Sequence, residues 1–397
     1  MRVVLLGAAG SMASVVLRDL LEFAPDVAVT AADRLQVVID DSRVQVMPLD
    51  VRDEDATARL LSGNDVCLNC VNYYFNVPVM RAALRARVAY ADLGGLYHVT
   101  LQQFALDEDF RRAGVSAVLG IGSTPGITNV IAGTLARGLD RVESIDVRVG
   151  CVDSRQNGPL PVPYALDTVL DEFALEPMVF RGGRAESVAP MSGAEPIDFP
   201  QPIGNAEAFH TLHSEIAMFP RSFPELREAS FKVAFDADFT ARMRFLVELG
   251  FASREKLHSG VSPRDVLLAL AARQATDEGE PTDCDVLRVD LSGVKAGKLL
   301  RRRGEMTVRP HPNWRVPAGS LDTGVPLSVV GQMLANRTIS ASGVLCPETA
   351  VPGELFFAEL ERRGLRVRWT GAGFDEVDEV EKQGESREHR IDQPRDR

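Results

Sequence analysis

Cysteine is scarce in this chain of 397 residues, and its few copies are scattered. The five cysteines are Cys67, Cys70, Cys151, Cys284 and Cys346. Cys67 and Cys70 have C-x-x-C spacing, but the run 65–71 around them is typical of a strand, whereas a redox or zinc pair needs a turn. No second cysteine pair and no histidine pair stands at a metal-ligand spacing. We therefore expect buried free thiols and no metal site.

The chain also lacks an excess of basic charge and any long apolar run. Its net charge of −12 argues against a nucleic acid or an anionic membrane as partner, because binding to phosphate groups needs a basic surface. No apolar run approaches the ~18 residues of a membrane span. Met1 and Arg2 lead directly into a first strand and leave no room for a signal peptide. We therefore expect a cytoplasmic protein whose partner is a small molecule.

The overall composition is ordinary for a globular protein. Apolar residues make up 45% of the chain and charged residues 25%. A length of 397 residues suggests two or three domains. Residues 374–397 alternate charges with almost no apolar side chains, so we expect a disordered tail there.

A glycine-rich turn follows the first apolar run. Residues 3–6 predict a strand buried on both faces, and Gly7 and Gly10 then predict a tight turn into a helix that starts near Ser11. Such a turn presents bare backbone N–H groups at the positive end of a helix, where a pyrophosphate binds. The spacing is G-x-x-G-x-x-A, one residue off the commoner motif, so the alternative is a glycine turn that binds nothing. Asp33 favours the dinucleotide, because it ends the next apolar run, where a ribose-binding acid is expected.

Strands and helices alternate up to about residue 144, which indicates an α/β fold with a doubly wound parallel sheet. Ligands bind beyond the carboxyl ends of the strands in such sheets. The segments that follow three strands are therefore candidates for the site: the amide- and aromatic-rich run 69–76, Asp92, and the glycine-rich loop 120–129. The alternatives are a polar loop with aromatic cover for the first and a packing turn for the last.

The pattern changes beyond Ile145. Strand-like runs at 145–151, 178–180, 231–235, 284–294 and 299–308 no longer alternate strictly with the helical stretches 164–173, 239–249 and 263–276. We therefore expect a second, α+β domain with a mixed or antiparallel sheet over residues 145–318. Within it, the proline-rich residues 190–202 predict a loop. Over 319–373 we expect a helix starting near Leu321, a turn at 343–348, another helix and a short strand at 365–369.

Several short motifs occur in a familiar order. They are the N-terminal glycine turn, Tyr73-Tyr-Phe-Asn76, Tyr90-Ala-Asp92, Ala113-Gly114, residues 122–129, Thr323-Gly-Val-Pro326 and Gly343-Val-Leu-Cys-Pro347. Together they resemble the saccharopine dehydrogenase family, which includes saccharopine reductases, lysine 6-dehydrogenases and carboxynorspermidine synthase. The resemblance covers nearly the whole chain before the tail. It implies a Rossmann-type dinucleotide domain of residues 1–144, completed by C-terminal helices at 319–373, with an inserted substrate and dimerisation domain at 145–318, and a homodimer.

The resemblance implies an NAD(P)-dependent oxidoreductase that transfers a hydride at the C–N carbon of an amino acid, an opine-like conjugate or a polyamine precursor. The family pattern assigns the pyrophosphate to Gly7, Gly10, Ser11, Met12 and Ala13, the adenosine ribose to Asp33 or Arg34, the adenine to Asp50 and Val51, and the nicotinamide end to Cys70, Val71 and Asn72. Asp33 favours NAD, whereas Arg34 could clamp the 2′-phosphate of NADP. The balance leans slightly to NAD.

Amine oxidation needs a base that takes the proton from the ammonium. Tyr73 and Asp92 match positions near the reaction centre of the family's reductases. Asp92 serves as an acid/base only if burial raises its pKa, and otherwise it anchors an ammonium. The chain departs from the reductases at Asn72, Asn76, Thr124 and Asn129, which leaves a second hypothesis: a non-catalytic dinucleotide sensor or scaffold with the same fold.

His213 and Glu215 form another titratable pair. They alternate in a predicted strand and could point into one pocket, with histidine as base and glutamate as partner of an amine; the alternative is a solvated strand face. Arg155 and Tyr164 fall where the family's substrate loop lies, so Arg155 is a candidate carboxylate clamp, and Asn129 is a third candidate substrate contact. Residues 301–303, three arginines in a row, predict an exposed strand end rather than a site.

Overall fold

A seven-stranded parallel sheet forms the first half of the molecule. The computed structural model describes residues 1–153, 160, 162, 164–273 and 279–373. The strand order is β15-β6-β5-β4-β1-β2-β3, and every pairing is parallel. The strands are β1 (Arg2–Leu6), β2 (Ala28–Asp33), β3 (Val44–Pro48), β4 (Val66–Asn69), β5 (Ala89–Asp92), β6 (Ser116–Val118) and β15 (Gly343–Leu345). The order reverses between β1 and β4, which is the position where such sheets bind ligands.

Helices cover both faces of this sheet. Val3 and Leu5 pack into one apolar cluster and Val4 and Leu6 into another, because successive side chains of a strand point to opposite faces. On one face lie α1 (Ser11–Phe23) and α11 (Ala318–Ala335), and on the other α2 (Glu54–Leu61) and α3 (Asn76–Ala86) pack together. The 3₁₀ turn η1 (Tyr73–Phe75) lies between β4 and α3 in the chain. Helices α4 (Leu96–Phe104) and α5 (Asp107–Ala113) connect β5 to β6. The prediction of a doubly wound α/β sheet is confirmed.

The C-terminal part of the chain returns to this sheet in a different form from the prediction. Residues 343–345 form strand β15 beside β6, where the sequence predicts a turn. Helix α11 begins at Ala318 rather than near Leu321, and Pro326 lies inside it. A Cβ on Gly324 would lie 2.7 Å from Cβ of Val15, and one on Gly331 2.7 Å from Cδ2 of Leu68. Close packing on α1 and β4 therefore stabilises this helix despite its proline and glycines.

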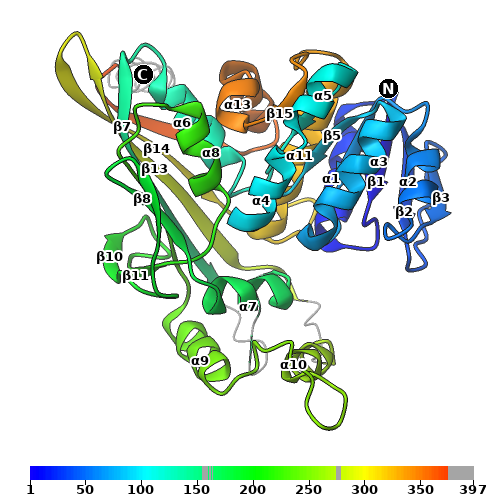
Figure 1. The fold of residues 1–397 in the computed structure, drawn as a ribbon, viewed down its shortest axis with the longest axis horizontal. Helices are drawn as coiled ribbons and strands as arrows, with labels where there is room; N and C mark the ends of the chain where they lie inside the picture. The colour runs from blue at the N-terminus through cyan, green and yellow to red at the C-terminus, as the bar shows by residue number, and fades with distance from the viewer. Residues whose placement is uncertain (154–159, 161, 163, 274–278, 374–397) are drawn as a thin grey trace, which may run out of the picture.

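The second sheet is mixed and has nine strands, with the path β10-β11-β12-β7-β13-β14-β16; off this path β8 pairs with β12, and β9 pairs with β8. Among the described strands of this sheet, only β12 and β7 pair in parallel. The strands are β7 (Arg141–Asp153), β8 (Met178–Arg181), β9 (Arg184–Ser187), β10 (Glu195–Asp198), β11 (Asn205–His210), β12 (Glu228–Ala234), β13 (Asp283–Lys295), β14 (Lys298–Val308) and β16 (Val367–Gly371). The expectation of a mixed sheet beyond Ile145 is confirmed, and Figure 1 shows its long strands beside the parallel sheet.

Three local predictions in this half were wrong. Residues 195–198, predicted as loop, pair with β11. Strand β16 pairs with β14, so this segment belongs to the mixed sheet rather than to the dinucleotide domain. The arginine run is not simply an exposed end: Arg302 is buried and donates to the carbonyls of Leu135 and Arg137 at 2.5 and 2.8 Å. Backbone groups at the end of α6 thus find a buried donor that the sequence pattern does not reveal.

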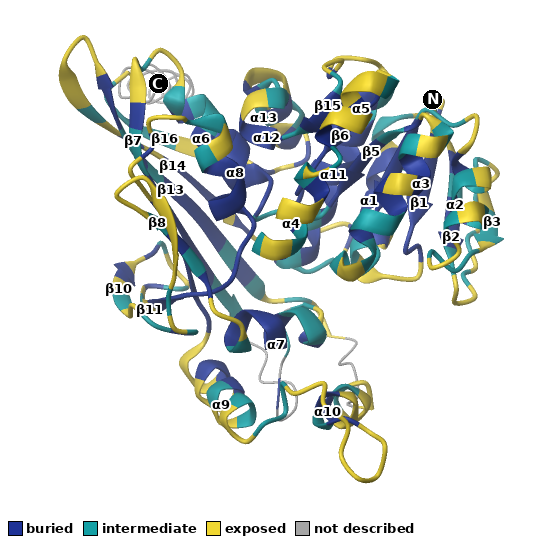
Figure 2. Ribbon diagram, in the orientation of Figure 1, coloured by how far each residue is buried: buried dark blue, intermediate teal, exposed yellow. Residues whose placement is uncertain are grey.

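The remaining helices connect and cover the two sheets. They are α6 (Ile127–Ala136), α7 (Leu166–Ala174), α8 (Glu215–Ser222), α9 (Ala237–Glu248), α10 (Pro263–Ala271), α12 (Pro347–Ala350) and α13 (Gly353–Glu361). Figure 1 shows α7, α9 and α10 at the lower end of the long strands. Figure 2 shows that the long strands are largely buried whereas α9 and α10 carry many exposed residues. The predicted tail, 374–397, lies outside the described residues.

Candidate active site

The turn between β1 and α1 has the backbone shape that a bound phosphate needs. Gly7 has φ +79°, and a Cβ there would lie 2.8 Å from the carbonyl carbon of Cys70. The N–H of Gly10 donates to the carbonyl of Gly7 at 2.9 Å, and α1 begins at the next residue with no acidic side chain in its first turn. The first N–H groups of a helix have no intrahelical acceptor. Gly10, Ser11 and Met12 border the main cavity, and Ala13 is buried behind them, so these residues fit a pyrophosphate.

The predicted ribose and adenine residues lie together beside this turn but outside the cavity lining. Asp33 accepts hydrogen bonds from the backbone N–H of Ala9 at 3.0 Å and of Leu35 at 2.8 Å. Asp50 accepts a bond from Nε of Arg52 at 2.9 Å, and the charge of Arg34 adds to this pairing, so the pKa of Asp50 falls to about 2. Val51 is half-buried in the same region. Arg34 and Arg52 make this end of the site locally basic.

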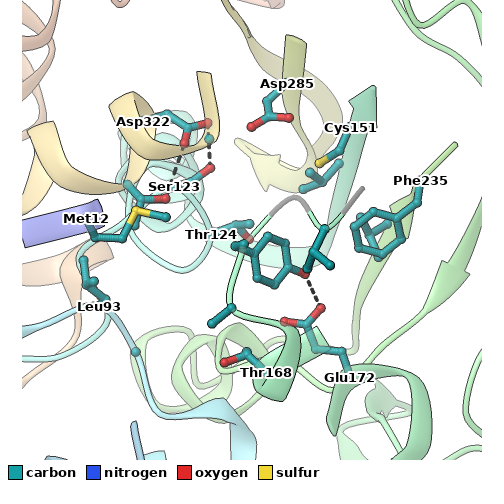
Figure 3. A pocket seen from close by; sticks show the side chains of 18 of the residues that line it. Met12, Leu93, Ser123, Thr124, Cys151, Thr168, Glu172, Phe235, Asp285 and Asp322 are labelled. Atoms are coloured by element: carbon teal, nitrogen blue, oxygen red, sulfur yellow. Dashed lines mark hydrogen bonds between the residues drawn. The ribbon is translucent and has the colours of Figure 1, made fainter. Parts of the chain in front are cut away.

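A cavity of about 780 Å³ lies between the carboxyl edge of the parallel sheet and the mixed sheet. Met12 and Leu93 approach it from the dinucleotide side, Asp322 and Ser123 from α11 and the glycine-rich loop, and Phe235 from the position directly after β12 (Figure 3). The mixed sheet contributes one face, because alternate residues of a strand point the same way. These residues are Val149, Cys151 and Asp153 of β7, Phe231 and Val233 of β12, and Asp283 and Asp285 of β13.

The run after β4 reaches the cavity as expected. Cys70, Val71, Asn72 and Tyr73 all line it. The side chain of Asn72 caps η1 by accepting the N–H of Tyr74 at 3.1 Å. The hydroxyl of Tyr73 donates to Oδ2 of Asp171 at 2.7 Å, and burial together with hydrogen bonding to its neighbours raises the pKa of Tyr73. Tyr73 therefore stays protonated and acts here as a hydrogen-bond donor.

Asp92 does not reach the cavity, contrary to the prediction of a catalytic acid/base. Its side chain is fully buried and accepts bonds from the Tyr90 hydroxyl at 2.8 Å and from Nε2 of Gln103 at 2.6 Å. It also accepts the N–H groups of Gly94 at 3.0 Å and Gly120 at 2.7 Å. Burial raises the pKa of Asp92 although all four donors oppose the shift. The carboxylate therefore fixes two loops at the cavity edge rather than contacting a ligand.

His213 and Glu215 meet, but not through the predicted strand. Strand β11 ends at His210, and Glu215 is the first residue of α8. Nδ1 of His213 lies 2.5 Å from Oε2 of Glu215, and the imidazole stacks on the ring of Phe231 with 3.8 Å between centroids. Burial opposes charge on His213, but the Glu215 and Glu172 carboxylates outweigh it and raise its pKa. His213 lines the cavity, and Glu215 lies fully buried behind it.

The other carboxylate oxygen of Glu215 is held by the glycine-rich loop. Oε1 accepts the hydroxyls of Thr124 and, at 3.1 Å, Thr128. Burial raises the pKa of Glu215, but the charge of His213 and these donors outweigh it, so the pKa is lowered. Thr124, one of the departures from the reductase pattern, thus takes part in fixing the His213–Glu215 pair.

The predicted substrate residues fare differently. Tyr164 lines the cavity and donates its hydroxyl to Oε2 of Glu172 at 2.5 Å. Asn129 is fully buried outside the lining, where it accepts the N–H of Gly126 at 3.1 Å and donates to Oε2 of Glu348 at 2.9 Å. Its role in this structure is to join the glycine-rich loop to α12. Arg155 lies outside the described residues.

Sequence reasoning missed the acidic character of the cavity. Seven carboxylates line it: Asp153, Glu172, Asp236, Asp238, Asp283, Asp285 and Asp322. Among the described lining residues, Arg242 of α9 is the one arginine or lysine. The acids come from α7, α9, α11, β7 and β13, and nothing in their local sequence indicates that they share a wall. The only signal was the spacing Asp283-x-Asp285 in a strand, which places two acids on one face.

Burial raises the pKa of several of these acids. Burial raises the pKa of Asp285 to about 7, with the nearby charges of Asp283 and Asp153 adding to the effect. Burial also raises the pKa of Glu172 to about 7, against the opposing charge of His213. Asp322 is fully buried, accepts the Ser123 hydroxyl at 3.0 Å, and has a pKa raised by burial and by Asp285. A cation in this cavity would favour the charged form of all three.

A parallel sheet with a phosphate-shaped turn at its switch point, and a polar cavity at the same edge, defines a dinucleotide-dependent oxidoreductase. The chain belongs to the saccharopine dehydrogenase family. Residues 3–118 match the family's model of the saccharopine dehydrogenase NADP binding domain, and residues 122–365 match the saccharopine dehydrogenase C-terminal domain. It is thus an NAD(P)-dependent dehydrogenase that acts on C–N groups, as the sequence predicted.

Curated relatives carry different substrate names. Carboxyaminopropylagmatine dehydrogenase of Synechocystis is 24% identical over 353 residues, covering 85% of this chain and 88% of that protein. Carboxynorspermidine synthase of Vibrio alginolyticus is 23% identical over 250 residues, covering 59% of each chain. The solved structure of apo saccharopine dehydrogenase (L-Glu forming) from Saccharomyces cerevisiae has a TM-score of 0.70 and 18% identity, covering 94% of this chain and all (100%) of that one. This structural match shows the shared fold.

Two further findings concern the described residues only. They contain no helix with both the length and the apolar character needed to cross a bilayer. All five cysteines are free, and no group of three or more histidine, cysteine, aspartate or glutamate side chains in these ranges is arranged so that it could hold a metal ion.

Proposed function

We propose that this enzyme transfers a hydride between NADP and the C–N carbon of a carboxylated polyamine conjugate. The observation that carries the proposal is that, among the described lining residues of the cavity, seven carboxylates face a single arginine, directly beside the glycine turn. Amino-acid substrates with several carboxylates would meet repulsion on such a wall, whereas a chain of ammonium groups would be attracted to it. The names of two relatives, carboxyaminopropylagmatine dehydrogenase and carboxynorspermidine synthase, describe compounds of this kind.

The two charges of such a substrate would bind at different places. Asp283, Asp285 and Asp322 form the acidic end, where the ammonium groups of the chain would pair with carboxylates. Arg242 on α9 supplies the cation for the substrate carboxylate, in a role that the sequence predicted for Arg155. The cavity volume of about 780 Å³ lies within the usual range for a small-molecule site.

His213 is the proposed base. A neutral imidazole that donates Nδ1–H to Glu215 carries its lone pair on Nε2. Nε2 would take the proton from the substrate amine before the hydride leaves, and the buried Glu215 carboxylate would stabilise the imidazolium that forms. In the opposite direction the imidazolium would return this proton to nitrogen. Tyr73 would border the reacting carbon as a protonated donor rather than as a base.

The nicotinamide ring supplies the hydride chemistry when the cofactor is bound. Gly7, Gly10, Ser11 and Met12 would hold the pyrophosphate, and Cys70 to Asn72 the nicotinamide end. The ribose end supports NADP, although Asp33 alone suggests NAD. Both oxygens of Asp33 already accept backbone N–H groups, and Arg34 and Arg52 provide the cations that a 2′-phosphate needs.

Two finer expectations belong to this proposal. Free cysteines support a cytoplasmic location. A homodimer is supported by the large apolar side chains exposed on α9 and α10, which include Phe245, Leu249 and Leu270. Sedimentation velocity of the purified protein measures the oligomeric state directly.

A cofactor-linked substrate screen tests the function. The purified enzyme is assayed with carboxylated polyamine conjugates, saccharopine and lysine, and the formation of NADPH from NADP or of NADH from NAD is measured for each. Turnover confined to the polyamine conjugates supports the proposal. Preference for saccharopine would contradict it, and cofactor binding without any turnover would favour the sensor or scaffold hypothesis.

A further inference from the structure

A pair of tyrosines from the dinucleotide side meets one carboxylate of the substrate side. The hydroxyl of Tyr73 donates to Oδ2 of Asp171 at 2.7 Å, and the hydroxyl of Tyr74 donates to the same oxygen. The two rings lie 4.2 Å apart between centroids. The tyrosines form η1, directly after the strand end that lines the cavity, whereas Asp171 lies on α7. The contact therefore joins the two regions that the family models describe separately.

Asp171 is itself held firmly from the other side. Its Oδ1 accepts Nη1 of Arg264 at 2.7 Å, and both side chains are almost completely buried. The same nitrogen lies 3.0 Å from Oδ1 of Asp167, and Nε of Arg264 donates to the carbonyl of Ala252 at 2.9 Å. Arg254 adds a second cation, 3.5 Å from Asp171 and over the ring of Tyr74 at 4.8 Å. With both oxygens in use, Asp171 has a fixed position.

The same helix forms part of the cavity wall. Thr168 and Glu172 of α7 line the cavity, and Asp167 and Asp171 face the arginines. Glu172 carries the hydrogen bond from Tyr164 and influences the charge of His213. We call the seven carboxylates of the cavity lining the acid wall. A change in the position of α7 relative to η1 would therefore change the distance between the acid wall and the cofactor end of the cavity.

We propose that Asp171, held by Arg264, is the positioning residue for Tyr73 and fastens helix α7 to the cofactor end of the cavity. We call the contact of the Tyr73 and Tyr74 hydroxyls with Asp171 the latch. The hydroxyls come from the region that matches the NADP binding domain, and the carboxylate comes from the region that matches the C-terminal domain. The effect of the latch on turnover rests on the proposed function, whereas its effect on the mobility of α7 does not.

Hydrogen exchange tests the latch without any substrate. The double variant Tyr73→Phe/Tyr74→Phe removes two hydroxyls and leaves α7 unaltered in sequence. We expect amide exchange of residues 166–174 to become about tenfold faster in the full-length protein, because a locally held helix opens more readily when a buried bond is lost. Exchange in α6, which packs on α12 and β13, serves as the internal reference. Unchanged exchange at 166–174 would overturn the proposal.

Kinetics test the positioning role. Asp171→Asn is compared with Asp167→Asn, a matched change one turn earlier on α7 that touches the same arginines but neither tyrosine. We expect Asp171→Asn to lower kcat about tenfold, with the Kd for NADPH within about twofold of wild type, and Asp167→Asn to stay within about twofold in both. Combining Asp171→Asn with Tyr73→Phe should add no further loss, because both remove one interaction. Additive losses, or equal effects of the two aspartate variants, would overturn the positioning role. If no substrate is turned over at all, the proposed function fails, and the exchange experiment still decides the latch.

Discussion

His213 and Glu215 form a buried pair in which Nδ1 lies 2.5 Å from the carboxylate and Nε2 is left for the cavity. Glu215 is fixed in turn by hydroxyls of Thr124 and Thr128 from the glycine-rich loop. The pair therefore depends on three segments: the loop between β6 and α6, the start of α6 and the start of α8. This arrangement resembles the base-and-orienter pairs of many enzymes, in which the second group sets the tautomer of the first.

Replacing Glu215 tests this pair. In Glu215→Gln the ring loses its anionic partner, so we expect kcat to fall about a hundredfold, the lower end of what general-base catalysis contributes. The apparent pKa of the kcat/KM profile should also fall, because the charge that raises the pKa of His213 is removed. Glu348→Gln is the matched control, since Glu348 is a buried glutamate outside the cavity lining. Equal losses in both variants would assign Glu215 a purely structural role.

Substrate affinity should depend on pH through Asp285. Its pKa is raised from 3.8 to about 7, so the carboxylate is largely neutral at pH 6 and charged at pH 8. We expect KM for a cationic substrate to fall as pH rises through about 7, and the dependence to flatten in Asp285→Asn. An initial-rate series from pH 6 to 8.5 with a polyamine conjugate gives this profile. A KM that rises over the same range in the wild type would contradict the assignment.

The same residue should cost stability. A carboxyl whose folded pKa lies above its unfolded value binds more protons in the native state, so the free energy of unfolding decreases as pH rises between 3.8 and about 7. Asp285→Asn removes this penalty. We therefore expect the Tm difference between variant and wild type to be positive at pH 8 and to shrink at pH 5. Thermal unfolding of both proteins at the two pH values provides the measurement, and an equal difference at both would be inconsistent with burial of the charge.

Gly7→Ala should abolish cofactor binding. Gly7 and Gly63 share φ +79°, but a Cβ on Gly7 would lie 2.8 Å from the Cys70 backbone, whereas one on Gly63 meets nothing within 4 Å. Both changes incur the positive-φ penalty of about 1–2 kcal/mol. Only Gly7→Ala must also displace the strand end beside the nicotinamide. Fluorescence titration with NADPH should show binding by Gly63→Ala and none by Gly7→Ala; retained binding in Gly7→Ala would remove the turn from the cofactor site.

We expect the choice between NADP and NAD to depend on Arg34. If its guanidinium contacts a 2′-phosphate, Arg34→Ala should weaken NADPH binding about tenfold and leave NADH binding unchanged, since a charged hydrogen bond is worth about 1.5–3 kcal/mol. Arg59→Ala, at the last turn of α2, controls for the loss of a positive charge nearby. Calorimetric titration with both nucleotides measures the ratio. A wild type that binds NADH more tightly than NADPH would restore the slight preference for NAD that Asp33 suggests.

The parallel sheet and the glycine turn could be predicted from the sequence. The buried run 3–6, the glycines after it and the alternation up to residue 144 predict the parallel sheet and its turn, because each depends on neighbours in sequence. The strand-end rule also placed Cys70 to Tyr73 correctly at the cavity. It could not say which way a strand-end side chain points, so it placed Asp92 at the reaction centre although four donors hold it inside the protein.

The acid wall could not be predicted, because its members are distant in sequence. Asp153, Asp285 and Asp322 come from two strands of the mixed sheet and from helix α11 on the parallel sheet, and only the folded chain brings them to one cavity. Strand β15 was missed for a related reason: three residues have too little pattern to predict a strand, and β6 supplies the pairing edge. His213 and Glu215 were predicted to meet, but the reason was wrong, since a turn into α8 joins them rather than strand alternation.

The central claim is that the acid wall selects a cationic chain beside the cofactor. The most direct measurement compares kcat/KM for a carboxylated polyamine conjugate and for the same conjugate with its distal amine acetylated, in the wild type and in the variant Asp283→Asn/Asp285→Asn. We expect the wild type to prefer the charged conjugate by about a hundredfold, because two charge-assisted hydrogen bonds contribute about 1.5 kcal/mol each, and the variant to lose most of this preference. Equal kcat/KM for the two conjugates in the wild type would contradict it.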